Sequence, residues 1–298
     1  MRTSREPTES NGTESAAAVA VTVALANQKG GVGKTTSAVN LSVLLARHGL
    51  RVLLVDFDPQ GNATSSLGVD KRTLDATVYD VLVGGLATAD VVMADVRERL
   101  DLLPSTPTLA GAEVELVGIA KRERALLRAL TQVKGRYDVI LMDCPPSLGL
   151  LTVNALTAAD FVLVPIQCEF LALEGLGQLI TTIDLVKRQL NPSLDVLGVL
   201  MTMYDARTRL SASVVEEVRR YFPHRIFRTL VPRSIRLAEA PSYGQAIAEY
   251  DPESRGAQAY RAVSEELLER LRLAAPAFGS ELNIEAFAPA GADVGKGG

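Results

Sequence analysis

A glycine-rich segment near the amino terminus constrains the fold of this chain more than any other feature. It reads A-N-Q-K-G-G-V-G-K-T-T over residues 26–36, after an apolar run with valines at alternate positions and before an apolar helical pattern. A strand, a glycine-rich turn and a helix in this order form the setting in which a Walker A pattern indicates a phosphate-binding loop. The alternative is a glycine-rich strand–helix turn that merely carries surface lysines.

The residue types in this segment suit the binding of a polyphosphate. Glycines let the backbone turn its N–H groups toward phosphates, and the helix that follows adds the positive end of its dipole. Lys34 can neutralise the β and γ oxygens, and the Thr35 hydroxyl can hold Mg²⁺. The candidate phosphate-binding residues are Lys29, Gly30, Gly31, Val32, Gly33, Lys34, Thr35 and Thr36.

Lys29 is the unusual member of this loop. It stands directly before the glycines, in a segment that already contains Lys34. Two lysines so close together repel each other unless they share strong negative charge. We hypothesise that Lys29 reaches phosphates bound by a second subunit, so that two monomers enclose two nucleotides. A solvated surface lysine is the alternative.

Three aspartates stand at the carboxyl ends of expected strands, the edge at which open α/β sheets bind ligands. Of Asp56 and Asp58, one could orient an attacking water, and strand-end capping is the alternative for either. Asp143 follows four apolar residues, where an ionised group needs a cation or donors to compensate it. We expect Asp143 to hold Mg²⁺ through water, although capping of the next turn can coexist with that role.

The alternation of β-branched runs and amphipathic stretches predicts an α/β fold. Several runs are continuously apolar, which is typical of parallel strands covered on both faces, so we expect a doubly wound, mainly parallel sheet with helices on both faces. The expected strands span residues 18–26, 51–56, 100–104, 137–143, 161–165, 195–203 and 225–231. The expected helices include residues 35–48, 173–190 and 211–221.

Length and composition favour one domain. The chain has 298 residues, 47% of them hydrophobic, with no linker-like stretch in its middle, so we expect a single domain over residues 18–273. We expect the polar residues 1–17 and the Ala/Gly/Pro-rich residues 274–298 to be loose tails. The 2 cysteines are too few for a disulfide framework, and no apolar run could span a bilayer, so we expect a soluble cytoplasmic protein.

Positive charge is concentrated in one segment. Residues 205–236 hold eight arginines and three acidic residues, a balance of +5 in a chain whose net charge is −4. Such asymmetry suggests a surface for phosphates, and phosphate contacts bind nucleic acid without reading its sequence. A solvated helix face with pairs such as Glu216–Arg220 is the alternative.

Further segments extend the pattern of the phosphate loop. They are V-D-F-D-P-Q-G-N-A-T at residues 55–64, D-C-P-P-S-L at 143–148, A-L-E-G-L at 172–176, T-M-Y-D-A-R-T at 202–208 and P-R-S-I-R-L-A-E-A-P-S at 232–242. With K-G-G-V-G-K-T-T, they resemble the ParA/Soj branch of chromosome- or plasmid-partitioning ATPases, in the ParA/MinD superfamily of P-loop proteins with a deviant Walker A loop. The resemblance covers about residues 20–270.

The resemblance implies weak ATP hydrolysis, with ATP and Mg²⁺ bound at the loop. It assigns the water-orienting role to Asp58, within a nucleotide-sensing switch that continues through Gln60, and it puts Pro232 in a loop beside the adenine. The candidate catalytic residues are then Lys29, Lys34 and Asp58, and the candidate magnesium residues are Thr35, Asp58 and Asp143.

The resemblance also implies partners. An ATP-bound homodimer would bind the double-stranded DNA of the nucleoid nonspecifically, and a ParB-type centromere-binding protein would stimulate hydrolysis and release the dimer. Slow unstimulated hydrolysis is expected, because a site without a built-in arginine finger lacks much of the transition-state stabilisation. Arg207 and Arg236 match positions associated with DNA contact in this branch, and Arg209 and Arg233 are weaker candidates.

Two other functions compete with partitioning. A MinD-like, membrane-associated regulator of the division site needs a basic amphipathic helix, whereas residues 261–275 carry three arginines balanced by three glutamates. Iron–sulfur carriers of the superfamily hold their clusters with cysteines, and Cys144 and Cys168 are weak support for that interpretation. We therefore expect a DNA-segregation ATPase that does not bind membranes.

Overall fold

The computed structural model describes residues 20–169 and 172–274, without the side chains of residues 172–175, 273 and 274. The expected tails, residues 1–17 and 274–298, lie outside the described part of the chain apart from the backbone of residue 274. In the described ranges, no helix is both long enough and apolar enough to cross a membrane.

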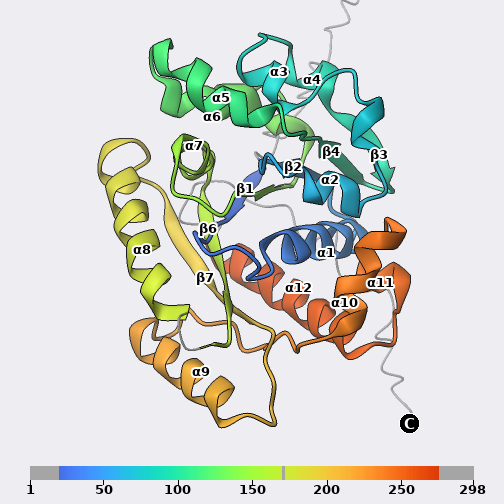
Figure 1. Cartoon of the computed structure of the whole chain (residues 1–298), viewed down its shortest axis with the longest axis vertical. Coiled ribbons are helices and arrows are strands. Elements are labelled where there is room, and N and C mark those ends of the chain that lie inside the picture. Colours follow the sequence, from blue (N-terminus) through green and yellow to red (C-terminus); the bar gives the residue numbers. More distant parts are fainter. Residues whose placement is uncertain (1–19, 170–171, 275–298) are drawn as a thin grey trace, which may run out of the picture.

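A single twisted sheet organises the described residues. Its strand order is β3-β4-β2-β5-β1-β6-β7, and all neighbouring strands are parallel except β3 and β4 (Figure 1). The strands are β1 Val21–Leu25, β2 Val52–Asp56, β3 Met93–Arg97, β4 Leu100–Leu103, β5 Val139–Asp143, β6 Phe161–Gln167 and β7 Asp195–Thr202. Every residue of β1, β2 and β5 is buried, as their continuously apolar sequences predict.

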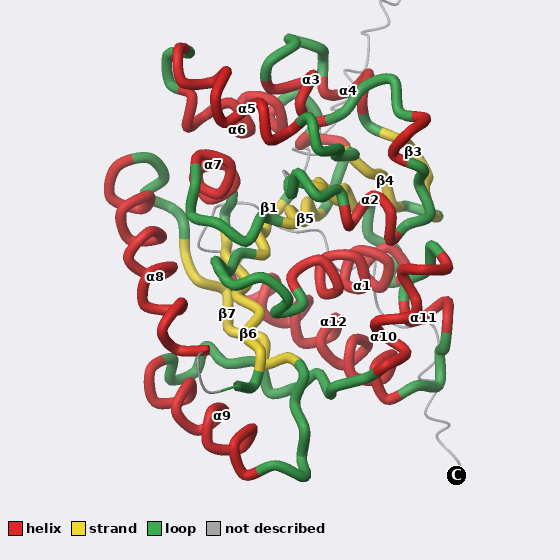
Figure 2. The backbone as a smooth tube through the Cα atoms, in the orientation of Figure 1, coloured by secondary structure: helices red, strands yellow, loops and turns green. Residues whose placement is uncertain are grey.

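The described helices lie between the strands and after β7, and they can be divided into longer and shorter ones (Figure 2). The longer ones are α1 Lys34–Arg47, α7 Leu150–Ala158, α8 Ala172–Gln189, α9 Arg209–Tyr221 and α12 Arg255–Ala274. The shorter ones are α2 Asn62–Ser66, α3 Val78–Leu82, α4 Thr88–Val91, α5 Leu109–Glu115, α6 Ala125–Thr131, α10 Ile235–Glu239 and α11 Ile247–Tyr250. The 3₁₀ turns are η1 Lys71–Thr73, η2 Leu116–Gly118, η3 Arg122–Arg124, η4 Lys134–Arg136 and η5 Ala240–Tyr243.

An apolar core lies on each face of the sheet. On one face, α1 and α12 bury side chains such as Leu41, Leu45 and Tyr260 against the strands. On the other face, α6, α7 and α8 bury side chains such as Leu126 and Leu156. The predicted doubly wound, mainly parallel sheet with helices on both faces is therefore confirmed.

The prediction of a strand at residues 225–231 is wrong. This segment runs beside β7 but forms only an isolated bridge, between Ile226 and Val199. Its ladder is interrupted because the N–H groups of Arg228 and Thr229 donate to the Glu266 carboxylate on α12. A second side chain of α12 also contacts this segment: Arg270 donates to the carbonyls of residues 225 and 226, the first of which also accepts the Val199 N–H of β7.

The edge strand β3 was not predicted. It is short and partly exposed, and Asp95 interrupts it with a φ of 51°, so its sequence lacks the apolar run that marked the buried strands. The first expected strand, residues 18–26, corresponds to β1 Val21–Leu25, and residues 18 and 19 lie outside the described part of the chain. The remaining strands and the three expected helices are confirmed, with ends shifted by one or two residues.

Replacing Glu266 tests whether its buried carboxylate holds residues 225–231 beside β7. Its side chain is 4% exposed and pairs with Arg270 at 2.9 Å. Glu266→Ala leaves that guanidinium and two N–H groups without their acceptor, so we expect the free energy of unfolding to fall by about 3 kcal/mol. Glu265→Ala, one residue away and exposed, should change it by less than about 0.5 kcal/mol. Equal denaturation midpoints for the two variants would contradict this role.

Candidate functional site

The glycine-rich loop joins the carboxyl end of β1 to the amino end of α1. Gly31 and Gly33 have φ values of 75° and 89°, in the left-handed region that side chains with a Cβ rarely adopt. Gly33 is the N-cap of α1 and offers no side chain to the first turn, so the N–H groups of that turn remain available to an anion. The backbone thus has the conformation that the predicted anion-binding loop requires.

Lys34 folds back over this loop. Its side chain is buried, and its ammonium donates to the Lys29 carbonyl at 3.0 Å. Burial lowers the pKa of Lys34, whereas the negative charge of Asp143, and to a lesser degree that of Asp58, raises it. The ammonium is therefore held inside the loop, beside two of the predicted carboxylates.

Lys29 is engaged within its own chain. Its ammonium forms an ion pair with Glu169, which follows β6, and both side chains are about one-third exposed (35% and 36%). Its N–H donates to the Asn27 side chain at 3.0 Å, and the Asn27 amide donates to the Pro165 carbonyl at 2.8 Å. Lys29 is thus fixed at its backbone, with its side chain directed to a carboxylate.

Asp143 carries an uncompensated carboxylate at the end of β5. Both of its oxygens are buried and lack a hydrogen-bond partner in the described residues. Burial, together with the charges of Asp56 and Asp58, raises its pKa well above the usual range; Thr35 and Lys34 lower it by less. The Thr35 hydroxyl lies near without reaching hydrogen-bond geometry. A buried acceptor without a donor, beside a threonine hydroxyl, fits a hard divalent cation.

Asp56 holds the start of α2. The N–H and the hydroxyl of Thr64 both donate to its carboxylate at 2.7 Å, and the sheet register places it beside Asp143. Burial raises the pKa of Asp56 to about 6, although the Thr64 hydrogen bonds oppose that shift. This geometry matches the structural, capping interpretation of Asp56.

Asp58 lies in the turn that follows β2. One carboxylate oxygen accepts the Gln60 N–H at 2.9 Å, and in the described part of the chain no donor reaches the other oxygen. Gln60 is exposed, and its carbonyl accepts the Lys71 ammonium at 2.6 Å. The structure therefore brings Asp58, Asp143, Lys34 and Thr35 to one edge of the sheet, with Gln60 at its rim.

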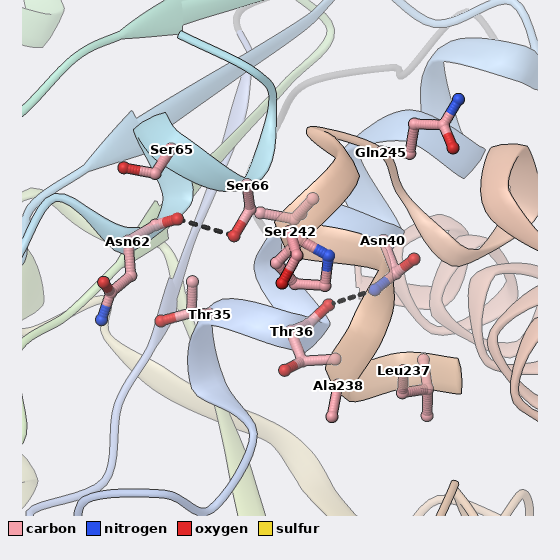
Figure 3. Close-up of a pocket in the computed structure, with 12 residues that line it drawn as sticks. Thr35, Thr36, Asn40, Asn62, Ser65, Ser66, Leu237, Ala238, Ser242 and Gln245 are labelled. Atoms are coloured by element: carbon pink, nitrogen blue, oxygen red, sulfur yellow. Dashed lines mark hydrogen bonds between the residues drawn. The ribbon is translucent and has the colours of Figure 1, made fainter. Parts of the chain in front are cut away.

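A cavity of about 420 Å³ opens beside this edge (Figure 3). Its lining side chains carry no charge and come from α1, α2 and the α10–η5 segment; they are Thr35, Thr36, Val39, Asn40, Asn62, Ser65, Ser66, Leu237, Ala238, Pro241, Ser242 and Gln245. Pro232 is not among them and instead bridges to Tyr204. Asn40 was not predicted; its signal in the sequence is a polar residue on a buried helix face, one turn after Thr36.

Six of the eight arginines of residues 205–236 separate into two groups, and the other two, Arg219 and Arg220, are exposed on α9. Arg225 and Arg228 pair with Asp195, Glu266 and Glu269 and thereby fasten the chain to β7 and α12. The four predicted DNA-binding arginines are exposed: Arg207 pairs with Asp205, Arg236 with Glu239 and Asp251, Arg209 begins α9, and Arg233 donates its N–H to Tyr204. Arg207, with a smaller effect from Arg233, lowers the pKa of Asp205.

The pKa of Asp56 predicts how stability depends on pH. Because the folded-state value of about 6 exceeds the ordinary 3.8, the folded chain holds this proton more tightly than the unfolded chain. The stabilisation from protonated Asp56 is present below pH 4 and is lost as pH rises through 6, a change of about 3 kcal/mol. In chemical denaturation without nucleotide, Asp56→Asn should flatten this fall, whereas Asp75→Asn, at an exposed carboxyl, should not. Identical pH profiles would refute the assignment.

Comparison with known proteins places this site in a family. The family model described as "AAA domain" matches residues 20–196. The sporulation initiation inhibitor protein Soj of Bacillus subtilis is 55% identical over 245 residues, 82% of this chain and 97% of that protein. The chromosome-partitioning ATPase Soj of Thermus thermophilus is 50% identical over 250 residues, 84% of this chain and 96% of that protein.

A solved structure shares the fold. The structure described as cobyrinic acid a,c-diamide synthase from Mycobacterium smegmatis, with bound ATP analogue and magnesium, has a TM-score of 0.75 and 42% identity and covers 85% of this chain and 96% of that chain. Its described activity differs from that of the more identical Soj proteins. With phosphate loop, carboxylates and sheet order in place, the chain belongs to the Soj/ParA family of chromosome-partitioning ATPases.

Proposed function

We propose that this ATPase is an ATP-dependent DNA-binding switch of the cytoplasm. ATP loading pairs two copies, the dimer holds nucleoid DNA without reading its sequence, and hydrolysis stimulated by a ParB-type centromere-binding protein releases it. The observation that carries the proposal is the meeting, at one sheet edge, of an uncapped helix start, the buried Lys34 ammonium and the unpartnered Asp143 carboxylate. Polyphosphate and a divalent cation would compensate all three.

The phosphates and the nucleoside of ATP would bind to different parts of this site. The N–H groups of residues 30–36 and the Lys34 ammonium would bind the phosphates, and Thr35, Asp58 and Asp143 are the candidates to hold Mg²⁺. When bound, Mg²⁺ neutralises charge on the phosphate oxygens. The uncharged nucleoside would lie beyond Thr36, between Pro232 and the neutral cavity, whose α10 wall continues from that proline. The Mycobacterium relative, with ATP analogue and magnesium, supports this assignment.

Asp58 is the proposed residue for water orientation. One of its oxygens is fixed by the Gln60 N–H, which leaves the other to accept a hydrogen bond from the attacking water. Such a role is mainly positioning, because phosphoryl transfer needs little covalent help from the protein. Gln60, beside it on the rim, would sense whether the γ-phosphate is present.

Lys29 would change its partner when two copies meet. The Glu169 pair is partly exposed, and such pairs stabilise by about 1 kcal/mol or less. A triphosphate carries more negative charge than one carboxylate, so it would draw the ammonium away when a second subunit presents it. Release from Glu169 would therefore accompany dimerisation.

Lys29→Ala tests the two-subunit site. We expect the variant to bind ATP with an affinity within about threefold of wild type, because Lys34 and the loop N–H groups remain. It should stay monomeric with ATP in light scattering and lose at least about tenfold in hydrolysis. Lys121→Ala, at an exposed lysine of another segment, should dimerise normally. A Lys29→Ala protein that dimerises and hydrolyses ATP like wild type would overturn the role.

The exposed arginines are the proposed DNA surface. Arg207 and Arg233 lie near Asp205, Arg209 begins α9, and Arg236 lies at the start of α10. The carboxylates that pair with Arg207 and Arg236 are also exposed or partly so, and a DNA phosphate can displace them. Binding that rests on phosphate contacts should be independent of DNA sequence and should weaken steeply with salt.

DNA retention distinguishes these arginines from ordinary surface charge. We expect Arg207→Ala/Arg236→Ala to lower ATP-dependent DNA affinity by at least about tenfold, while ATP binding stays unchanged. Arg72→Ala is a matched control, because Arg72 pairs with Asp70 two residues away and its side chain is 88% exposed, as is that of Arg207. Retention should require ATP and should fail with ADP or without nucleotide. Equal retention with ATP, with ADP and without nucleotide would contradict the proposed nucleotide dependence of DNA binding.

The MinD-like alternative finds no support in α12. That helix turns its apolar side chains, including Tyr260, Val263 and Leu267, into the core shared with α1. A helix that binds a membrane surface needs its apolar face free for lipid. Partitioning on DNA is therefore the function that the described residues favour.

A further inference from the structure

Two side chains from neighbouring elements hold the turn that carries Asp58. Ser105, fully buried after β4, donates its hydroxyl to the Asp58 carbonyl at 2.9 Å. Lys71, in η1, donates its ammonium to the Gln60 carbonyl at 2.6 Å. The turn is closed by the Gly61 N–H, which donates to the Asp58 carbonyl at 2.9 Å. Both carbonyls that flank the Asp58–Gln60 step are therefore fixed from outside the turn.

The packing leaves this turn little freedom. Gly61 has a φ of 61°, and a Cβ added there would lie 2.6 Å from the Ser105 carbonyl oxygen and 2.7 Å from the Lys71 Cδ. Ser105 is itself anchored, because its N–H donates to the Thr64 hydroxyl at 3.0 Å, and that hydroxyl donates to Asp56 at 2.7 Å. A chain of buried hydrogen bonds thus runs from β2 through α2 to the end of β4 and back to the turn.

We propose that Ser105 and Lys71 are positioning residues for ATP hydrolysis. By fixing the two carbonyls, they set the direction of the Asp58 carboxylate, whose bound oxygen accepts the Gln60 N–H and whose other oxygen is left for the water. The inference rests on the proposed role of Asp58. Water orientation tolerates little displacement, so a looser turn lowers the rate of hydrolysis.

Their placement separates the rate of hydrolysis from the affinity for ATP. Neither residue belongs to the phosphate loop, and neither lines the neutral cavity. Loss of either donor should therefore lower kcat and leave KM for ATP unchanged. A residue that merely stabilised the fold would instead alter the unfolding midpoint and the amount of active protein, without this separation.

Single variants of the full chain give the first measurement. Ser105→Ala and Lys71→Met each remove one donor, and we expect kcat to fall by about tenfold while KM stays within about twofold. Ser105→Thr and Lys71→Arg keep a donor and should recover most of the rate. Thermal unfolding of each variant reports folding, and if Ser105→Ala does not fold, Lys71→Met at the surface decides the matter. Wild-type kcat in a folded Lys71→Met protein would overturn the proposal.

Asp58→Ala distinguishes the failure of this inference from the failure of the proposed function. If the donors act through Asp58, then adding Ser105→Ala or Lys71→Met to Asp58→Ala should change the residual rate by less than about twofold. Full independent losses in the double variants would refute the inference while leaving the role of Asp58 intact. Wild-type hydrolysis by Asp58→Ala would instead refute that role, and the inference with it.

Discussion

A pair of buried carboxyl groups at the carboxyl edge of the sheet is the constraint on which the rest of the structure depends. Asp56 and Asp143 face each other in register on adjacent strands, and both are fully buried. Asp56 has hydrogen-bond donors from α2, whereas Asp143 has none in the described residues. Because a buried carboxylate is unfavourable without compensation, this arrangement supports the proposal that the edge takes a cation and the phosphates that accompany it.

The same edge is connected to elements on both sides of the site. The Asp56–Thr64–Ser105 hydrogen bonds join β2, α2 and β4, and they end at the turn that carries Asp58. On the far side, Glu266 and Arg270 of α12 hold the segment that leads from β7 to Pro232. Side-chain hydrogen bonds therefore fix both the turn and the segment before Pro232 to the elements that pack on the sheet.

The positive charge of residues 205–236 is a property of the sequence, whereas the partners of these arginines are set by the fold. Two of the arginines fasten the chain to β7 and α12, and Arg207 and Arg236 are exposed yet already paired with carboxylates. The strand expected at residues 225–231 does not form for a related reason, since Glu266, about 40 residues away in the chain, accepts the N–H groups of Arg228 and Thr229. No local pattern carries such information.

The sequence by itself determined the phosphate loop, the parallel sheet and the aspartates at its edge, because glycine conformation, strand periodicity and the switch from strand to helix are local properties. Only the tertiary structure decided which charges have partners: Glu169 for Lys29, Thr64 for Asp56, and none in the described residues for Asp143. It also placed Ser105, Lys71 and Asn40 beside the site. These contacts depend on the order and register of strands, which join residues far apart in the chain.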